Sequence, residues 1–275
     1  MLIIFTLAAF WAPVCSTPTE ASLASIASEA TITTEANMSA PAARRSSKGE
    51  DVRIETRDHV RLGGTFYGPK STKGKAPAAL LVHDAGGDRS EVEDLAVQLQ
   101  KRGFAVLAID LRGHGDSVSE DTDWEKASDD KARASLWSFA ANDLKAASSW
   151  LRDRSEIHAS NLSIVGVGAG CALAVRHALD DENTRAVVLV APQPDNFGFN
   201  LPQGVGDLEG LPTLILAGKD KRSDATRLMD AAHRQYGENF IEVAVMKSEQ
   251  RKVLEDKRLA TELGQWLKSE VITKR

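Results

Sequence analysis

The fold is decided by Leu162-Ser-Ile-Val-Gly-Val-Gly-Ala-Gly-Cys-Ala-Leu-Ala-Val-Arg-His-Ala178, in which an apolar run leads into three alternating glycines. Ile164 and Val165 predict a buried strand, and the string 172–175 favours a helix. Glycine adopts positive φ angles and permits the close backbone approach that a very tight turn requires. The stretch therefore predicts a strand, a tight turn centred on Gly168 and a helix in immediate succession.

Strand and helix patterns alternate from Glu50 onward. Two β-like runs flank a turn at the start and predict a hairpin. Strands are predicted at 51–56, 60–67, 78–82, 104–109, around 164–165, 186–190, 213–217 and 241–245; helices at 91–102, 137–151, from 172, 224–236 and 253–268; and a surface loop or irregular helix at 117–134. This order predicts an α/β fold with an eight-stranded, mostly parallel sheet covered by helices on both faces. The short segment between the strands at 186–190 and 213–217 leaves no room for a large cap domain.

The composition is that of a soluble globular protein. The 275 residues are 42% hydrophobic and 27% charged, which suffices for a large buried core. The net charge of −5, with no long basic run, argues against nucleic acid or an anionic membrane as partner. The glycine cluster lacks the Lys-Ser/Thr ending of a phosphate-binding loop and the third-glycine spacing of a dinucleotide site, so no cofactor is expected.

The N-terminal region predicts export of a bacterial type. Leu2–Trp11 is apolar, too short for a membrane span and of the length of a signal-peptide core. Unlike a typical signal peptide, it has no basic residue before its apolar run. We expect a signal peptide over 1–16, a disordered Ser/Thr/Ala-rich linker over 17–49 and a folded domain over 50–275. The exported protein would be periplasmic, secreted or tethered to the surface. A lipid anchor at Cys15 is an alternative that its poor sequence context disfavours.

Five segments resemble those of α/β-hydrolases, most closely the esterase, lipase and serine-aminopeptidase-like branch. Asp58–Gly64 is similar to the opening hairpin of that family, Leu81–Gly87 to its H-G-x-x-G segment, and Ala108–Ser117 to its D-x-R-G-H-G-x-S turn. Gly166–Gly170 resembles the nucleophile elbow G-x-S-x-G, and Leu214–Asp220 resembles the strand and turn that present the catalytic acid. The resemblance implies the α/β-hydrolase fold.

The same resemblance implies a serine nucleophile, a histidine base and a carboxylate, and the sequence departs from this set. Gly168 stands at the nucleophile position, and the loop 245–252, where the family places its histidine, contains none; no histidine follows His233. The acid position is displaced to Asp220 or Asp224, either of which also suits a turn or a helix cap. Gly168 and Asp220 are therefore read as vestigial positions.

The oxyanion turn is altered as well. The residues that the resemblance implies for this turn are His83, Asp84, Ala85 and Ala169. Asp84 replaces the usual glycine, and its carboxylate would repel an oxyanion unless it points into solvent or pairs with Arg89 or Arg112. Several polar residues lie at the carboxyl ends of adjacent predicted strands, where they could form a metal site, but structural roles are favoured for them. These residues are His83, Asp84, Asp110, His114 and Asp116.

Two functional readings follow. The first is a catalytically inactive α/β-hydrolase-fold protein that binds a small molecule or a protein partner, or acts as a scaffold. The alternative is an active esterase or peptidase with a rearranged site, which would depend on His83 and His114. Cys171 could serve as a displaced nucleophile, but a cysteine at this point of a helix is more often a small buried filler.

Overall fold

The computed structural model describes residues 49–275 except 72–73, 194–196, 237–239 and 274–275. The predicted signal peptide, and all but the last residue of the predicted linker, lie outside the described residues and stay predictions. Within the part of the chain that is described, no helix has the length and apolar character needed to cross a membrane.

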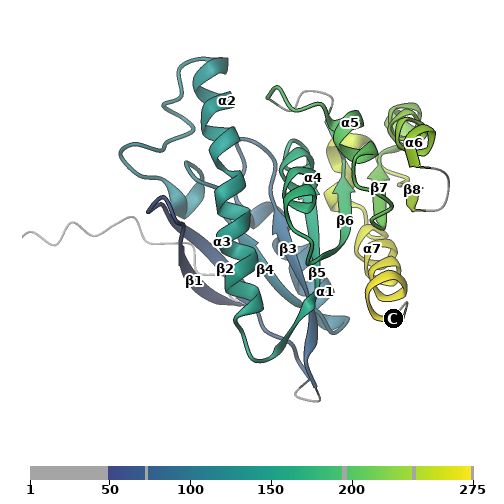
Figure 1. Ribbon diagram of the computed structural model, residues 1–275, viewed down its shortest axis with the longest axis horizontal. Coiled ribbons are helices and arrows are strands. Elements are labelled where there is room, and N and C mark those ends of the chain that lie inside the picture. Colours follow the sequence, from purple (N-terminus) through teal and green to yellow (C-terminus); the bar gives the residue numbers. More distant parts are fainter. Residues whose placement is uncertain (1–48, 72–73, 194–196, 237–239, 274–275) are drawn as a thin grey trace, which may run out of the picture. The chain divides into compact units, whose positions relative to one another are not determined.

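The described chain forms one eight-stranded sheet in the order β1-β2-β4-β3-β5-β6-β7-β8 (Figure 1). The first hairpin is antiparallel, β2 also pairs antiparallel with β4, and every other pair is parallel. The predicted eight-stranded, mostly parallel sheet is confirmed. The strands are β1 Glu50–Glu55, β2 Arg61–Tyr67, β3 Ala76–Val82, β4 Ala105–Ile109, β5 Ile157–Val167, β6 Thr184–Val190, β7 Thr213–Ala217 and β8 Ile241–Val245.

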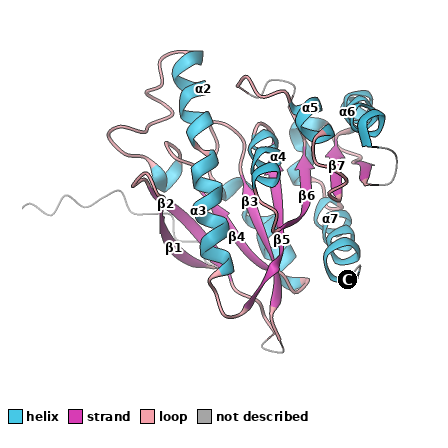
Figure 2. Cartoon of the chain, in the orientation of Figure 1, coloured by secondary structure: helices cyan, strands magenta, loops and turns pink. Residues whose placement is uncertain are grey.

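Helices cover both faces of the sheet, as Figure 2 shows. Side chains alternate along β3, so that Leu80 and Val82 join one buried cluster while Ala79 and Leu81 join the other. The first cluster includes apolar residues of α3, α4, α5 and α6, and the second those of α1 and α7. The helices are α1 Glu93–Lys101, α2 Asp130–Phe139, α3 Ala141–Arg152, α4 Gly170–Asp180, α5 Leu201–Gly206, α6 Arg222–Tyr236 and α7 Leu259–Leu267.

The parallel register aligns the carboxyl ends of the central strands. Val82 at the end of β3 pairs with both Ile109 of β4 and Gly166 of β5, and Val167 pairs with Val190 of β6. The loops that follow β3, β4, β5 and β6 therefore meet at one edge of the sheet, where α/β proteins place their ligands.

Two helix predictions were wrong in their boundaries. The helix expected over 137–151 is two helices, because α2 starts where the Asp129 side chain accepts a hydrogen bond from the Ala132 N–H at 2.8 Å, and the chain breaks at Ala140. The helix expected over 253–268 starts only at Leu259. A 3₁₀ turn precedes it, and Asp256 is extended there while its carboxylate accepts from the Ser248 N–H in the loop after β8.

Candidate functional site

The elbow between β5 and α4 is as tight as the glycine pattern predicts. Gly168 has φ +56°, and its N–H donates to the carbonyl of Val190 at 3.0 Å. A Cβ added to Gly166 would lie 2.5 Å from the Gly170 oxygen, and one added to Gly170 would lie 2.5 Å from the carbonyl oxygen of His83. Close backbone approach thus requires glycine at 166 and 170, and the positive φ favours it at 168.

The Asp84 carboxylate, in the loop after β3, bridges three donors around this elbow. Its Oδ1 accepts from the backbone N–H groups of Ala85 and Ala169, both at 2.8 Å. Its Oδ2 accepts from the side-chain amide of Gln193, in the loop after β6, at 2.6 Å. Loops from three strands are therefore joined through one side chain.

Neither expected environment of Asp84 is correct. Its side chain turns toward the elbow rather than into open solvent, and its hydrogen bonds come from neutral N–H groups rather than from Arg89 or Arg112. Both arginines are already engaged by other carboxylates, which are Asp110 and Asp116 for the first and Asp58 and Asp143 for the second.

Asp84 also fills the space that a side chain at position 168 would need. A Cβ built on Gly168 would lie 2.1 Å from Asp84 Cγ and 2.3 Å from each carboxylate oxygen. Burial raises the pKa of Asp84, and the hydrogen bonds from Ala169, Ala85 and Gln193 oppose this shift. The carboxylate thus lies where the side chain of a residue at the elbow would begin, and it is partly withdrawn from water.

The Cys171 thiol lies on the first turn of α4 and is fully buried. It donates to the carbonyl oxygen of Gly166 at 3.2 Å. Burial raises the pKa of the thiol well above its usual value, so the nucleophilic thiolate is disfavoured. These features match those of a small buried filler at the junction of strand and helix.

Both histidines of this edge are bound to backbone groups. Nε2 of His83 accepts from the Leu111 N–H at 3.0 Å, and its Nδ1 donates to the Asp84 carbonyl at 2.6 Å. Burial lowers the pKa of His83 to about 4. Nε2 of His114 accepts from the Gly86 N–H at 3.2 Å. Because the Nε2 lone pair of each ring already accepts a hydrogen bond from a backbone N–H, neither ring offers a free nitrogen to a metal. Among the described residues, no group of three or more potential ligands occurs.

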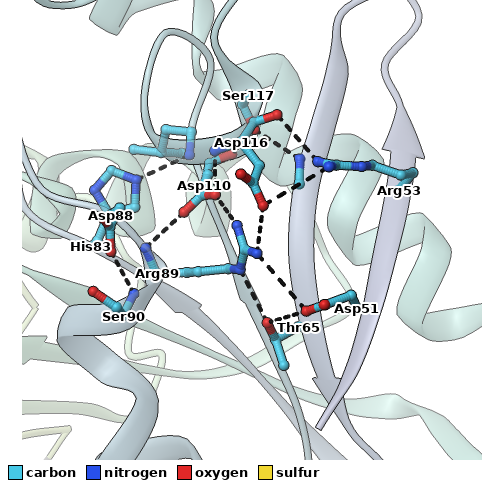
Figure 3. A network of polar contacts seen from close by, with 12 residues as sticks. Asp51, Arg53, Thr65, His83, Asp88, Arg89, Ser90, Asp110, Asp116 and Ser117 are labelled. Carbon is cyan, nitrogen blue, oxygen red and sulfur yellow. Dashed lines mark hydrogen bonds and ion pairs between the residues drawn. The ribbon is translucent and has the colours of Figure 1, made fainter. Parts of the chain in front are cut away.

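Figure 3 shows the polar network beside these histidines, which joins Asp110 and Asp116 to Arg89. The fully buried Asp110 pairs with the Arg89 guanidinium and accepts from the Arg89 N–H at 2.7 Å and the Asp116 N–H at 2.8 Å. The guanidinium also reaches the Asp116 carboxylate at 2.7 Å and the Thr65 hydroxyl at 3.0 Å. The network ties the loops after β3 and β4 to the antiparallel strand β2.

The loop after β8 is joined to its neighbours by Gln250. Its Oε1 accepts from the Gly218 N–H at 2.7 Å, and its Nε2 donates to the Pro192 carbonyl at 3.1 Å. The Gln250 N–H donates to the Asp220 carboxylate at 2.7 Å, so Asp220 holds this loop. Asp224 instead lies on α6, paired with Lys221 and Arg227.

Comparison with known proteins identifies the family. The model of the "Alpha/beta hydrolase family" matches residues 79–267, more than half of the chain. The chain belongs to the alpha/beta hydrolase family. Solved structures of the same fold include the esterase Pf2001 of Pyrococcus furiosus, with a TM-score of 0.64 and 18% identity over 81% of this chain and 91% of that one. A dienelactone hydrolase from Anabaena variabilis gives 0.60 and 20% over 82% and 98%.

Curated proteins with related sequences match parts of this alpha/beta hydrolase. An uncharacterised protein of Mycobacterium tuberculosis is 35% identical over 144 residues, which are 52% of this chain and 46% of the relative. A putative hydrolase of Bacillus subtilis, YtaP, is 26% identical over 56% of this chain and 60% of its own length. The chain thus spans about half the length of the curated relatives that it matches.

This alpha/beta hydrolase has a cavity of about 490 Å³ at the ends of β6 and β7. Gln193 and Gln250 line it, and Gln193 is also the residue that donates to Asp84 at the elbow. Three charged residues, Lys221, Asp224 and Arg227, line it as well. The apolar lining residues are Pro192, Leu201, Pro202, Ala217, Ala225 and Leu228.

Sequence reasoning missed the two glutamines. Glutamine does not titrate and is not part of the motifs by which the family is recognised, so Gln193 and Gln250 gave no signal. The roles of Arg89 and Arg112 also depend on contacts between residues far apart in the chain. By contrast, the structure does bring together four predicted residues: Asp84, Ala85, Gly168 and Ala169 meet at the elbow, while Asp220 lies with Gln250.

Proposed function

We propose that this chain is an alpha/beta hydrolase that has given up hydrolysis and binds a small molecule in the crevice beside the elbow. The observation that carries the proposal is the Asp84 carboxylate seated against Gly168, 2.1 Å from where a Cβ would lie. An attacking side chain at position 168 and the Asp84 side chain compete for the same space, and the chain has Asp84.

The oxyanion site supports the same conclusion. In enzymes with a nucleophile elbow, backbone N–H groups of the residue after the nucleophile and of the loop after the third strand bind the developing oxyanion. Here the corresponding N–H groups of Ala169 and Ala85 donate to Asp84 at 2.8 Å. A substrate carbonyl would have to displace a hydrogen-bonded carboxylate, and an ionised Asp84 nearby would repel the negative charge that forms.

No histidine is available to act as the general base. The loop after β8 places the Gln250 amide between the ends of β6 and β7, and an amide does not accept a proton at neutral pH. His83 and His114 use their Nε2 lone pairs for the Leu111 and Gly86 N–H groups. Neither imidazole can take a proton from a nucleophile without breaking these bonds.

We propose a ligand because the chain has a cavity at this edge of the sheet, although it lacks a nucleophile and a base there. The cavity of about 490 Å³ has a mainly apolar wall with two glutamines and three charged residues, Lys221, Asp224 and Arg227, and an apolar wall with a few polar groups is typical of small-molecule sites. We expect a ligand with an apolar body and one group that can exchange hydrogen bonds with Gln193 or Gln250.

The proposal is tested by assaying the purified protein with p-nitrophenyl butyrate and with a fluorophosphonate probe. We expect no turnover above the buffer rate and no labelling. Turnover that survives repurification and is lost in a Gly168→Ala variant would overturn the proposal. Binding is tested separately by thermal shift with p-nitrophenyl butyrate. The cavity-filling Ala225→Trp variant should abolish the shift, and Ser223→Trp on the exposed start of α6 should not.

A rebuilt enzyme is the positive control. Combining Gly168→Ser, Asp84→Gly and Gln250→His supplies a nucleophile, clears its space and places an imidazole next to Asp220. We expect esterase activity to appear in this triple variant. The matched triple with Gly168→Ala, which lacks the hydroxyl, should remain inactive.

A further inference from the structure

We propose that the cavity at the ends of β6 and β7 binds a carboxylic acid with an unbranched apolar chain. The ionised head group lies at the mouth of the cavity, beside Lys221 and Arg227, and the chain lies on the apolar floor. The inference deepens the proposed function, since it names the class of ligand and the side chains that select it. It rests on that proposal in taking this cavity to be the ligand site.

The cavity has an apolar floor and a charged mouth. The floor consists of the buried lining residues, which are Leu201 on α5, Ala217 at the end of β7, and Ala225 and Leu228 on α6. The helices α5 and α6 pack against each other at this end of the sheet (Figure 1). The mouth consists of Lys221, Asp224 and Arg227, whose side chains are 47%, 48% and 75% exposed. A ligand that suits both parts has an apolar body and a polar end that stays near water.

The mouth carries two cations and one carboxylate. Asp224 Oδ2 lies 3.3 Å from Lys221 Nζ, and Asp224 Oδ1 pairs with the Arg227 guanidinium. Among the ion pairs of the described residues, neither cation has a second carboxylate. Because an ammonium or a guanidinium has more than one N–H group, each can donate to a ligand carboxylate without releasing Asp224. A single added carboxylate would balance the charges of the mouth.

Charge and position favour a carboxylate over other head groups. An ammonium group would be repelled by the excess positive charge, and a neutral ester would gain no ion pair. Lys221 is held in the turn after β7, since its N–H donates to the Gly218 carbonyl at 3.0 Å and the Gly218 N–H donates to Gln250 Oε1 at 2.7 Å. The head group is therefore recognised by side chains of this turn and of α6, and not by the N–H groups at the elbow.

The test compares octanoate with octanamide, its neutral isostere, and with octylammonium, by isothermal titration calorimetry on the full chain. We expect octanoate to bind with a dissociation constant of about 0.1–1 mM, within reach of a ligand of about ten non-hydrogen atoms. Octanamide and octylammonium should bind at least about fivefold more weakly at low ionic strength. Added sodium chloride should narrow this difference, because the charged groups are exposed. Ala225→Trp, which fills the floor, should abolish binding of all three ligands.

Variants of the mouth separate ion pairing from the fit of the chain. Lys221→Glu and Arg227→Glu should each weaken octanoate binding about threefold to tenfold and change octanamide binding by less than about twofold. Asp224→Asn, which removes the competing carboxylate, should strengthen octanoate binding about twofold to fivefold. Lys219→Glu is the matched control, because Lys219 is exposed on the same 3₁₀ turn but does not line the cavity. It should change neither affinity by more than about twofold.

Three results would overturn the inference. The first is octanoate binding that is no tighter than octanamide binding. The second is a loss in the charge-reversal variants that is equal for both ligands, since the head group would then not be recognised by its charge. The third is octanoate binding that survives Ala225→Trp, because the chain would then lie elsewhere.

These outcomes are separable from those of the proposed function. Ester hydrolysis by the wild type would overturn the proposed loss of catalysis but leave a preference for octanoate unaffected. A wild type that is inactive and responds to p-nitrophenyl butyrate, but does not prefer octanoate to octanamide, would overturn only the carboxylic-acid inference.

Discussion

Two turns at the same edge of the sheet differ in how much of the family pattern they keep. The turn 110–117 after β4 matches the family pattern almost residue for residue, and its polar groups are paired: Asp110 with Arg89, and the Ser117 hydroxyl with the Asp110 carbonyl at 2.7 Å. The elbow after β5 keeps the glycine spacing but has Gly168 at the reactive position. The residues that hold these loops together are thus different from the residue at the nucleophile position, although they lie at the same edge of the sheet.

His83 connects the two turns. One ring nitrogen accepts from Leu111 in the first turn, and the other donates to the carbonyl of Asp84 beside the elbow. The position of the loop after β3 therefore does not depend on the residue at 168, because the His83 imidazole fixes this loop from both sides. Four predictions test this comparison.

The largest effect is expected from Arg112→Met in the retained turn. Arg112 forms two hydrogen bonds to the Asp143 carboxylate, at 2.8 and 2.7 Å, and Asp143 is fully buried. Removing the guanidinium leaves that carboxylate unpaired in the core, at a cost of about 3–5 kcal/mol in the free energy of unfolding. Urea denaturation measures the loss, and the exposed Arg57→Met is the control, expected to change stability by less than about 0.5 kcal/mol.

The second prediction concerns pH and the residue that joins the turns. Burial lowers the pKa of His83 to about 4, from its usual 6.5. As pH falls through this range, the unfolded chain takes up a proton at His83 that the folded chain does not, so stability falls with it. The full effect is about 3 kcal/mol, present above pH 6.5 and lost by pH 4.

Unfolding free energies measured between pH 7 and 4.5 test this dependence. The slope of the unfolding free energy against pH corresponds to the number of protons taken up on unfolding. This number should be smaller by up to one in His83→Asn, whatever the absolute stability of that variant. Equal slopes in wild type and variant would show that the imidazole is protonated in the folded state and does not link the turns as proposed.

The third prediction tests whether Asp84 and Gly168 exclude one another. Gly168→Ser should destabilise the protein, because serine is strained at φ +56° and its Cβ meets Asp84. Combined with Asp84→Gly, the serine should cost less by about 1–3 kcal/mol, the range of coupling between residues in contact. A double-mutant cycle gives this value directly. Additive effects would mean that Asp84 can move aside freely, so that Asp84 and a side chain at position 168 do not exclude one another.

The fold could be predicted from the sequence because its determinants are local. Apolar runs such as 78–82 and 213–217 are strands whatever their partners, and the glycines at 166–170 define a turn by their own φ angles. Two helix starts that the sequence did not predict, at Asp130 and Leu259, depend on single interactions. These are the Asp129 cap in the first case and the Asp256 contact with the loop after β8 in the second.

The site was only partly predictable, for the same physical reason. The motif positions identify Asp84 and Gly168 as departures from the family pattern. They do not reveal that Asp84 fills the space beside Gly168, because the two residues lie 84 positions apart in the sequence. The sequence predicts arginine partners for Asp84, because charge complementarity is visible in a sequence. The actual partners are two backbone N–H groups and a glutamine, which have no sequence signature.

The smallest effect is expected from Gln250→Leu in the loop that lacks a histidine. The variant loses two hydrogen bonds, to the Gly218 N–H and the Pro192 carbonyl, in a half-buried place that water can reach. The expected cost is about 1 kcal/mol, against a negligible change for Glu249→Leu next to it. A cost near that of Arg112→Met would contradict the contrast, because the loop after β8 would then hold the fold together as strongly as the turn after β4 does. A cost near zero would strengthen the contrast, since the Gln250 side chain would then not be needed to hold this loop in place.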